Sequence, residues 1–146
     1  MSRIIVGIDG SAHSQRALEW AVHEAALRQV PLSVIAVYRT VVAYWGGAVV
    51  FPEDHAIADK TRAVTQEATE KALALAGDTR PLNVTVEVVS GIPAEELINA
   101  SKGADLIVVG SRGTGGFARL LLGSVGTQVA HHAHCPIVVI PAEDRR

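Results

Sequence analysis

The sequence predicts an α/β protein in which helices cover both faces of a parallel sheet. Five short apolar runs, rich in branched residues, alternate with four segments that have helical spacing. Strands that alternate with helices are joined by right-handed crossovers, which make the sheet parallel. Most of the runs are almost continuously apolar, as strands buried on both faces are. A chain of 146 residues has the length of one domain, 1–146, and can bury a substantial core.

Composition narrows the classes of function. Apolar residues make up 49% of the chain and charged residues 19%, so we do not expect disorder. The net charge is −2 and there is no basic block, which is not typical of a nucleic-acid-binding protein. No stretch has the form of a membrane span or a signal peptide, so neither membrane insertion nor export is expected. The single cysteine, Cys135, leaves no disulfide within the chain and fits a cytoplasmic location.

The elements follow one another in a regular order. The predicted strands cover residues 3–8, 32–37, 83–89, 104–109 and 137–140. The predicted helices cover 15–29, 57–75, a short segment from Pro93, and 124–133. Apolar side chains of the second helix recur at Ile57, Val64, Ala68, Ala72 and Leu75. Ser14 is suited to cap the first helix and Gly77 to end the second. Residues 38–55 are predicted to form a long loop. The alternation of valine with polar residues over 83–89 indicates an edge strand.

The most informative stretch is rich in glycine and runs from Gly110 to Ser124. It follows an apolar strand and ends where a helix begins. Glycine lets backbone N–H groups approach a ligand closely, and a helix start presents unpaired N–H donors at the positive end of the helix dipole. This combination predicts an anion site, most often for phosphate. The spacing Gly110-x2-Gly113-x9-Gly123-Ser124 fits neither GxxxxGK(S/T) nor GxGxxG.

This spacing resembles the nucleotide loop of the universal stress protein family, Gly-x2-Gly-x9-Gly-Ser/Thr, and the resemblance extends from Ile4 to Ile140. It implies an adenine nucleotide alpha hydrolase-like fold, a three-layer sandwich around a five-stranded parallel sheet of order 3-2-1-4-5 with four helices. It also implies a site for ATP, with Mg²⁺ or Mn²⁺ bound through the nucleotide. The nucleotide-binding residues that it implies are Gly7, Ile8, Asp9, Val37, Val109, Gly110, Arg112, Gly113, Gly123, Ser124 and Val125.

Several of these residues have a second interpretation. The Asp9 carboxylate could accept ribose hydroxyls or help to hold a phosphate-bound metal, or it could bond its own turn. Arg112 could meet phosphate or be a solvated loop cation. Ser124 Oγ and nearby backbone N–H groups would hold the phosphates. Gly126 stands where many relatives carry a hydroxyl residue, which removes one phosphate contact.

Other polar groups do not predict catalysis. His131, His132, His134 and Cys135 lack metal-ligand spacing, and imidazoles suit a helix C-terminus, so we expect no metal held by the protein alone. No Ser/His/Asp spacing indicates a nucleophilic enzyme. The last strand would expose an apolar edge, and the family resemblance implies that a second copy covers it, in a homodimer through Pro136 to Pro141.

The leading hypothesis is therefore a cytoplasmic, ATP-binding stress-response protein that acts as a sensor or regulator, with little or slow hydrolysis. One alternative is an ATPase or an adenylyl- or phosphoryl-transfer enzyme on the same fold. Another is a dimeric adaptor that binds cyclic AMP or no nucleotide. Fold alone does not decide among them.

Overall fold

The computed structural model describes residues 2–39, 43–45, 48–50, 54–111 and 123–141, and its main sheet has five parallel strands. These strands are β1 (Ile4–Ile8), β2 (Leu32–Tyr38), β5 (Val84–Ser90), β6 (Leu106–Gly110) and β7 (Ile137–Ile140). The helices are α1 (Ala12–Arg28), α2 (Asp54–Ala76), α3 (Pro93–Ala100) and α4 (Ser124–His132). The sheet order is β5-β2-β1-β6-β7, which confirms the expected 3-2-1-4-5 order.

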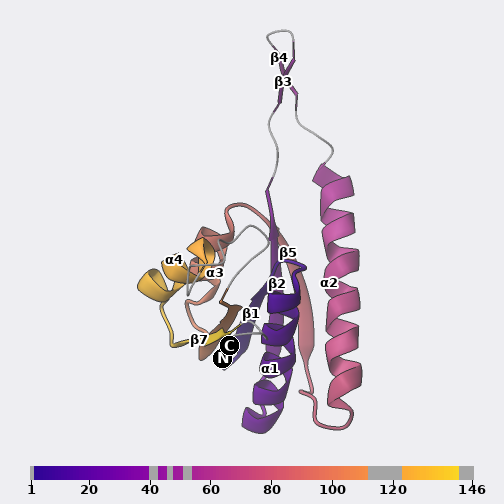
Figure 1. The fold of residues 1–146 in the computed structure, drawn as a ribbon, viewed down its shortest axis with the longest axis vertical. Helices are drawn as coiled ribbons and strands as arrows, with labels where there is room; N and C mark the ends of the chain where they lie inside the picture. Colours follow the sequence, from indigo (N-terminus) through magenta and orange to yellow (C-terminus); the bar gives the residue numbers. More distant parts are fainter. Residues whose placement is uncertain (1, 40–42, 46–47, 51–53, 112–122, 142–146) are drawn as a thin grey trace.

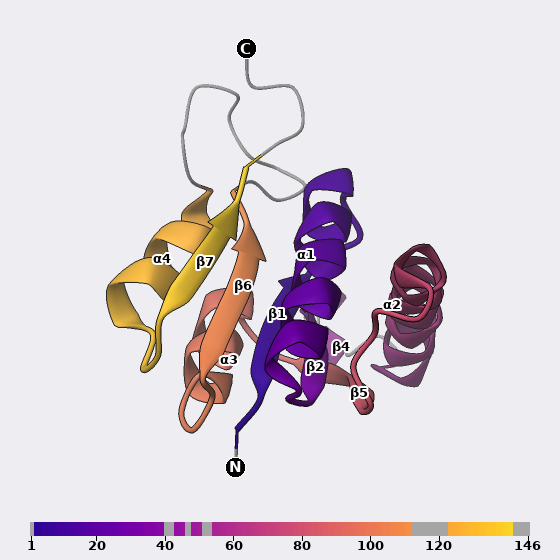
Figure 2. The ribbon, with the colours of Figure 1, turned by 90° about the horizontal axis from the view of Figure 1, so that it is seen from below.

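The helices form two layers, one on each face of the sheet (Figure 1). Helices α1 and α2 cover one face, and α3 and α4 cover the other (Figure 2). Each face has its own apolar core: Ile4, Val6 and Leu18 belong to the first, and Ile5 and Ile107 to the second. All five side chains are fully buried, which confirms that the first strand is apolar because both of its faces are covered.

The central strand β1 marks the point at which the direction of strand addition reverses. The chain adds β2 and then β5 on one side of β1, and it returns to add β6 and then β7 on the other side. Strand β1 pairs in parallel with β2 and β6, so the carboxyl ends of all three lie at the same edge. In sheets of this kind, ligands bind at that edge, beside the reversal.

Helix α1 begins earlier than the sequence suggested. Its N-cap is Ser11, whose Oγ accepts a hydrogen bond from Ser14 N (3.2 Å), so the prediction that Ser14 is the cap was wrong. Gly10, at φ +84°, turns the chain so that Ser11 reaches the capping position. Ser14 instead lies buried in the first turn, where its hydroxyl donates to Ser11 O and accepts from Asp9 N.

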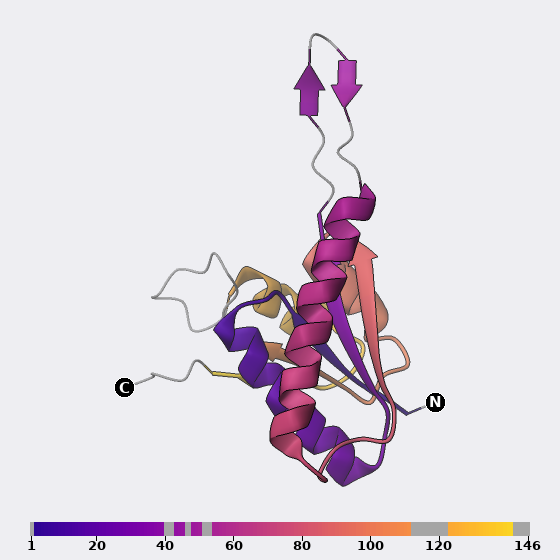
Figure 3. The same cartoon turned by 90° about the vertical axis from the view of Figure 1, so that its right-hand side faces the viewer.

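The predicted loop over 38–55 contains regular structure. Strands β3 (Ala43–Trp45) and β4 (Ala48–Val50) pair antiparallel, and α2 begins at Asp54. Figure 3 shows this hairpin beyond the start of α2, away from the main sheet. The sequence carried the signal, because two glycines stand between two short apolar runs, a pattern that favours a hairpin.

Helix α2 presents a different face to the core than its apolar spacing predicted. Ala72 is buried as expected, but Val64 and Leu75 are 46% and 69% exposed. The buried positions include Thr65 and Thr69, whose hydroxyls donate to backbone carbonyls one turn earlier, at 2.6 Å and 2.8 Å. A threonine that is satisfied in this way can pack at a helix interface, so hydrophobicity alone misplaced the buried stripe.

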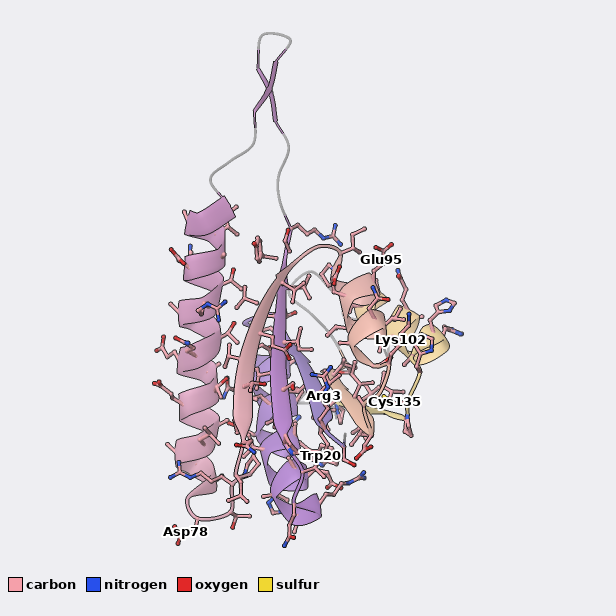
Figure 4. The ribbon with its side chains drawn as sticks, turned by 180° about the vertical axis from the view of Figure 1, so that it is seen from behind. Arg3, Trp20, Asp78, Glu95, Lys102 and Cys135 are labelled. Carbon is pink, nitrogen blue, oxygen red and sulfur yellow. The ribbon has the colours of Figure 1, made fainter. Side chains whose placement is uncertain are left out.

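Strand β5 lies at one edge of the sheet, as its alternating pattern predicted, and its polar face is ion-paired. In β5, Glu87 Oε2 lies 3.4 Å from Arg3 Nη1, and Thr85 donates to Ser33 Oγ. Arg3 also donates to Ser33 Oγ (3.1 Å) and to Ala100 O (3.3 Å). Arg3 therefore connects β2 and the edge strand β5 to the end of α3, on the side of the sheet visible in Figure 4.

Candidate functional site

The β1–α1 turn places Asp9 at the carboxyl edge of the sheet. The Asp9 side chain is exposed, and its Oδ1 accepts a hydrogen bond from Ser11 N (2.9 Å). Asp9 N donates to Ser14 Oγ at 3.3 Å. Of the two interpretations of Asp9, the turn role is therefore observed, since the carboxylate shapes the turn that starts α1.

Gly110 brings the start of the glycine-rich segment against this turn. A Cβ added to Gly110 would lie 3.0 Å from His13 O and 3.1 Å from His13 C. These distances are shorter than most Cβ contacts and the atoms are backbone, so glycine lets the end of β6 approach the first turn of α1 without displacing it. The structure therefore brings Asp9 and Gly110 to the same edge, as expected if their strands are neighbours.

The two ends of the glycine-rich segment are also joined to each other. Gly123 N donates to Ser111 O at 2.6 Å, and Ser111 N donates to Ile140 O at 2.8 Å. Ser111 is only 3% exposed, so this junction is buried. The predicted ligands Arg112 and Gly113 lie outside the described residues, but the positions on either side of them are fixed at the carboxyl edge.

Helix α4 starts at this junction with its first N–H groups directed along the helix axis. Its N-cap, Gly123, makes no side-chain cap hydrogen bond, and the first turn carries no acidic residue. The N–H and the hydroxyl of Thr127 both donate to Gly123 O at 2.9 Å. Ser124 is exposed and Val125 half-buried, so the donor end of α4 is accessible at Ser124.

The remaining predicted residues are packed into the two cores. The Leu97 side chain covers Gly7, where an added Cβ would lie 2.8 Å from Leu97 Cδ1. Ile8 belongs to the core under α1 and α2, while Val37 and Val109 belong to the core under α3 and α4. These positions can therefore offer a ligand mainly backbone groups, and Gly7 has a packing role that the sequence did not reveal.

One cation at this edge was missed by the sequence analysis. Arg16, one turn into α1, donates from Nη1 to the carbonyl of Pro141, directly after β7. In the sequence, Arg16 is marked only by its position shortly after the turn at Asp9. That position does not distinguish it from an ordinary surface arginine.

His131 and His132 lie in the last turn of α4, at the opposite end of the helix from Ser124. His131 and His132 are exposed, with ring centroids 6.2 Å apart. Among the described residues, no group of three His, Cys, Asp or Glu side chains could hold a metal ion.

Burial, and secondarily the charge of Asp105, raises the pKa of the Cys135 thiol. Figure 4 shows Cys135 and Arg3 well away from Glu95, in the first turn of α3.

No described helix combines the length and the apolar character that a membrane span needs.

Comparison with known proteins agrees with this architecture. The chain matches the universal stress protein family over residues 1–141. It is 36% identical over 143 residues to a universal stress protein of Mycolicibacterium smegmatis, a match that covers 97% of this chain and 49% of the relative. A universal stress protein of Mycobacterium tuberculosis is also 36% identical, with 97% and 48% covered. The chain spans about half the length of these curated relatives.

Solved structures give the same result. The protein UspA of Lactobacillus plantarum has a TM-score of 0.77 at 27% identity, with 95% of this chain and 97% of that chain covered. A universal stress protein in complex with cAMP has a TM-score of 0.69 at 27% identity, with 95% of each chain covered. A complex of an Archaeoglobus fulgidus relative with dAMP shares the fold, with a TM-score of 0.65 at 22% identity and coverage of 96% and 98%. On this sequence and structural similarity, the chain belongs to the universal stress protein family.

Proposed function

We propose that this protein binds an adenine nucleotide, ATP, at the carboxyl edge of its sheet and acts as a sensor or regulator in a stress response. The observation that carries the proposal is the junction of three elements at that edge. The Asp9 turn follows β1, where the strand order reverses, and the end of β6 at Gly110 and the donor end of α4 at Ser124 lie beside it. An anion at this point would meet unpaired N–H groups and the positive end of a helix dipole.

Each part of the site has a proposed role. The N–H groups of the first turn of α4 and Ser124 Oγ hold phosphates, with Gly113 and Arg112 contributing from the glycine-rich segment. Val109, Gly110, Gly123 and Val125 offer backbone contacts on the phosphate side. Gly7, Ile8, Asp9 and Val37 line the ribose and adenine. The similar structure that was solved with cAMP supports a nucleotide in this fold, because a nucleotide supplies both a phosphate and a base.

A divalent cation, Mg²⁺ or Mn²⁺, would be held mainly by the nucleotide. The Asp9 carboxylate lies beside the proposed phosphate site, and it fits one contact to a phosphate-bound cation rather than a complete protein site. When bound, the cation would neutralise phosphate charge. No lysine follows Lys102, so the phosphate loop lacks the cation of a P-loop, and we expect little or slow hydrolysis.

Calorimetric titration with ATP and Mg²⁺ tests the proposal, with wild type, Gly113→Ala and Gly115→Ala compared. Gly113 belongs to the family spacing and Gly115 does not, so the second variant controls for the loss of a glycine in the same segment. The proposal predicts binding by wild type and Gly115→Ala and clearly weaker binding by Gly113→Ala. Equal affinities of the two variants, or no binding by any protein, would contradict the role of the loop.

Cyclic AMP is the alternative ligand that a specific observation favours. Gly126 in the first turn of α4 is buried and has no hydroxyl to offer a further phosphate, which suits a ligand with fewer phosphates. Competition between ATP and cAMP in the calorimeter separates the two ligands. Turnover of ATP well above background, abolished by Asp9→Ala, would instead favour the enzyme alternative.

We further propose that residues 1–146 form one domain, which works in the cytoplasm as a homodimer through Pro136 to Pro141. Strand β7 is an edge of the sheet, and Ile137, Val138 and Val139 are only partly buried. A second copy that pairs with β7 would cover this apolar edge. Sedimentation equilibrium tests the proposal, since a Val139→Pro variant loses one backbone donor and should shift the protein toward monomer.

A further inference from the structure

The end of β7 is held from two directions by parts of the proposed nucleotide site. The carbonyl of Ile140 accepts a hydrogen bond from Ser111 N at 2.8 Å, at the base of the glycine-rich segment. The next carbonyl, that of Pro141, accepts a hydrogen bond from Arg16 Nη1 of α1. The last residues of β7 therefore contact both the segment expected to bind phosphate and the helix that follows the Asp9 turn.

The same junction continues into α4. Ser111 O accepts a hydrogen bond from Gly123 N (2.6 Å), and Gly123 is the N-cap of α4. Gly110 packs against the backbone of His13, in the first turn of α1. A shift of α1 relative to α4 must therefore change either this packing or the hydrogen bonds to the end of β7.

The opposite side of β7 is the edge that a second copy would use. Strand β7 pairs with β6 in the register Val108 to Val138 and Gly110 to Ile140. Ile107 N bonds Pro136 O and Ser111 N bonds Ile140 O, so the backbone groups of the even-numbered residues point to β6. Because backbone groups alternate in direction along a strand, those of Ile137 and Val139 point to the open edge.

We propose that Arg16 is a positioning residue that couples nucleotide binding to the pairing of β7 with a second copy of this chain. The inference rests on the proposed function and on the proposed dimer edge. A nucleotide that bridges the Asp9 turn and the start of α4 fixes α1 in the position from which Arg16 reaches Pro141. That contact fixes the end of β7 in the extended form that pairing needs. Each event thus favours the arrangement that the other requires, and such coupling is reciprocal.

Sedimentation equilibrium with and without saturating ATP and Mg²⁺ measures this coupling as the ratio of the two dimer dissociation constants. For wild type we expect ATP to tighten the dimer about fivefold or more, the lower end of typical coupling between sites. Arg16→Gln removes the contact and should bring the ratio close to one. The control is Arg28→Gln, in the last turn of the same helix, which removes the ion pair with Glu24 (2.8 Å) far from the carboxyl edge of the sheet and should leave the ratio unchanged.

The ratio of the two dimer dissociation constants distinguishes a positioning role of Arg16 from a general effect of its positive charge. Loss of a positive charge near the proposed nucleotide site would weaken ATP binding to monomer and dimer alike, and it would leave the ratio of the two dimer dissociation constants unchanged. Arg16→Lys keeps the charge and one donor, so it should recover part of the coupling. Circular dichroism of each variant verifies that it folds. If Arg16→Gln does not fold, the ratios measured for wild type and for Arg16→Lys still test the proposal.

The possible failures are distinguishable. If calorimetry shows no ATP binding to wild type, the proposed function fails and the inference fails with it. If ATP binds but the dimer constant does not change, or if wild type is a monomer at every concentration, the coupling is wrong while nucleotide binding stands. If Arg16→Gln keeps the wild-type ratio, coupling exists but Arg16 does not carry it, which overturns the role proposed for this residue.

Discussion

The substitution Ser124→Asp should separate the stability of this protein from its nucleotide binding. Ser124 is the first residue of α4, its side chain is exposed, and the first turn contains no acidic residue. A carboxylate at a helix N-terminus interacts favourably with the dipole by about 0.3–1 kcal/mol. For a chain of this size, that gain corresponds to a rise in Tm of about 1–4 °C.

The same carboxylate would repel phosphate bound at the start of α4. At a separation of about 5 Å, each unit of phosphate charge costs about 1–3 kcal/mol for effective dielectric constants between 80 and 20. The predicted loss of ATP affinity is therefore about fivefold to 150-fold, since 1.4 kcal/mol is tenfold. A variant that is more stable yet binds ATP more weakly cannot be explained by damage to the fold.

Calorimetry with ATP and thermal unfolding monitored by circular dichroism provide the two measurements. Gln128→Glu adds the same charge one turn further along the exposed face of α4, and it should reduce ATP affinity much less. Ser124→Ala separates loss of the hydroxyl from gain of the charge. Wild-type ATP affinity in Ser124→Asp would refute the reasoning that phosphate binds at this helix start.

Three further predictions concern stability and reactivity. Gly110→Ala forces a Cβ to 3.0 Å from His13 O, so denaturant unfolding should show a loss of about 1–3 kcal/mol; an unchanged midpoint would contradict the close approach. Gln29 caps α1 at φ 57°, so Gln29→Gly should raise the free energy of unfolding by up to about 1 kcal/mol, and a lower Tm would contradict this. The Cys135 thiol, whose pKa burial raises, should be alkylated by iodoacetamide with a midpoint above the ordinary 9.0. Asp105→Asn should lower that midpoint, and a midpoint below 9.0 in wild type would contradict the burial.

Much of the fold could be predicted because the signal is local. The strand at Ile4–Ile8 is apolar on both faces, the strand at Val84–Ser90 alternates, and Pro93 suits the first turn of α3. The hairpin of β3 and β4 was missed because the prediction rested on the length of segment 38–55. The pair of glycines between two short apolar runs, which favours a turn, was not used. The face of α2 was misplaced because packed threonines carry no hydrophobic signal.

The candidate site could be predicted only in part. The glycine pattern predicted that Gly110 ends a strand and that a helix begins at Ser124, and both are confirmed, because glycine and a helix start have a specific backbone meaning. The Gly7 contact with Leu97 and the Arg16 bond to Pro141 join residues that are distant in the sequence, so no local pattern could reveal them. Which atoms of Asp9 face a ligand depends on tertiary structure in the same way.

Nuclear magnetic resonance tests the central claim most directly, by following backbone amides during titration with ATP and, separately, with adenosine. If phosphate binds at the start of α4, the amides of Ser124, Val125 and Gly126 should shift with ATP and move little with adenosine. Amides near Val37 should respond to both ligands, because they would face the base. Equal shifts at Ser124 with both ligands, or ATP-induced shifts confined to another surface, would contradict the account.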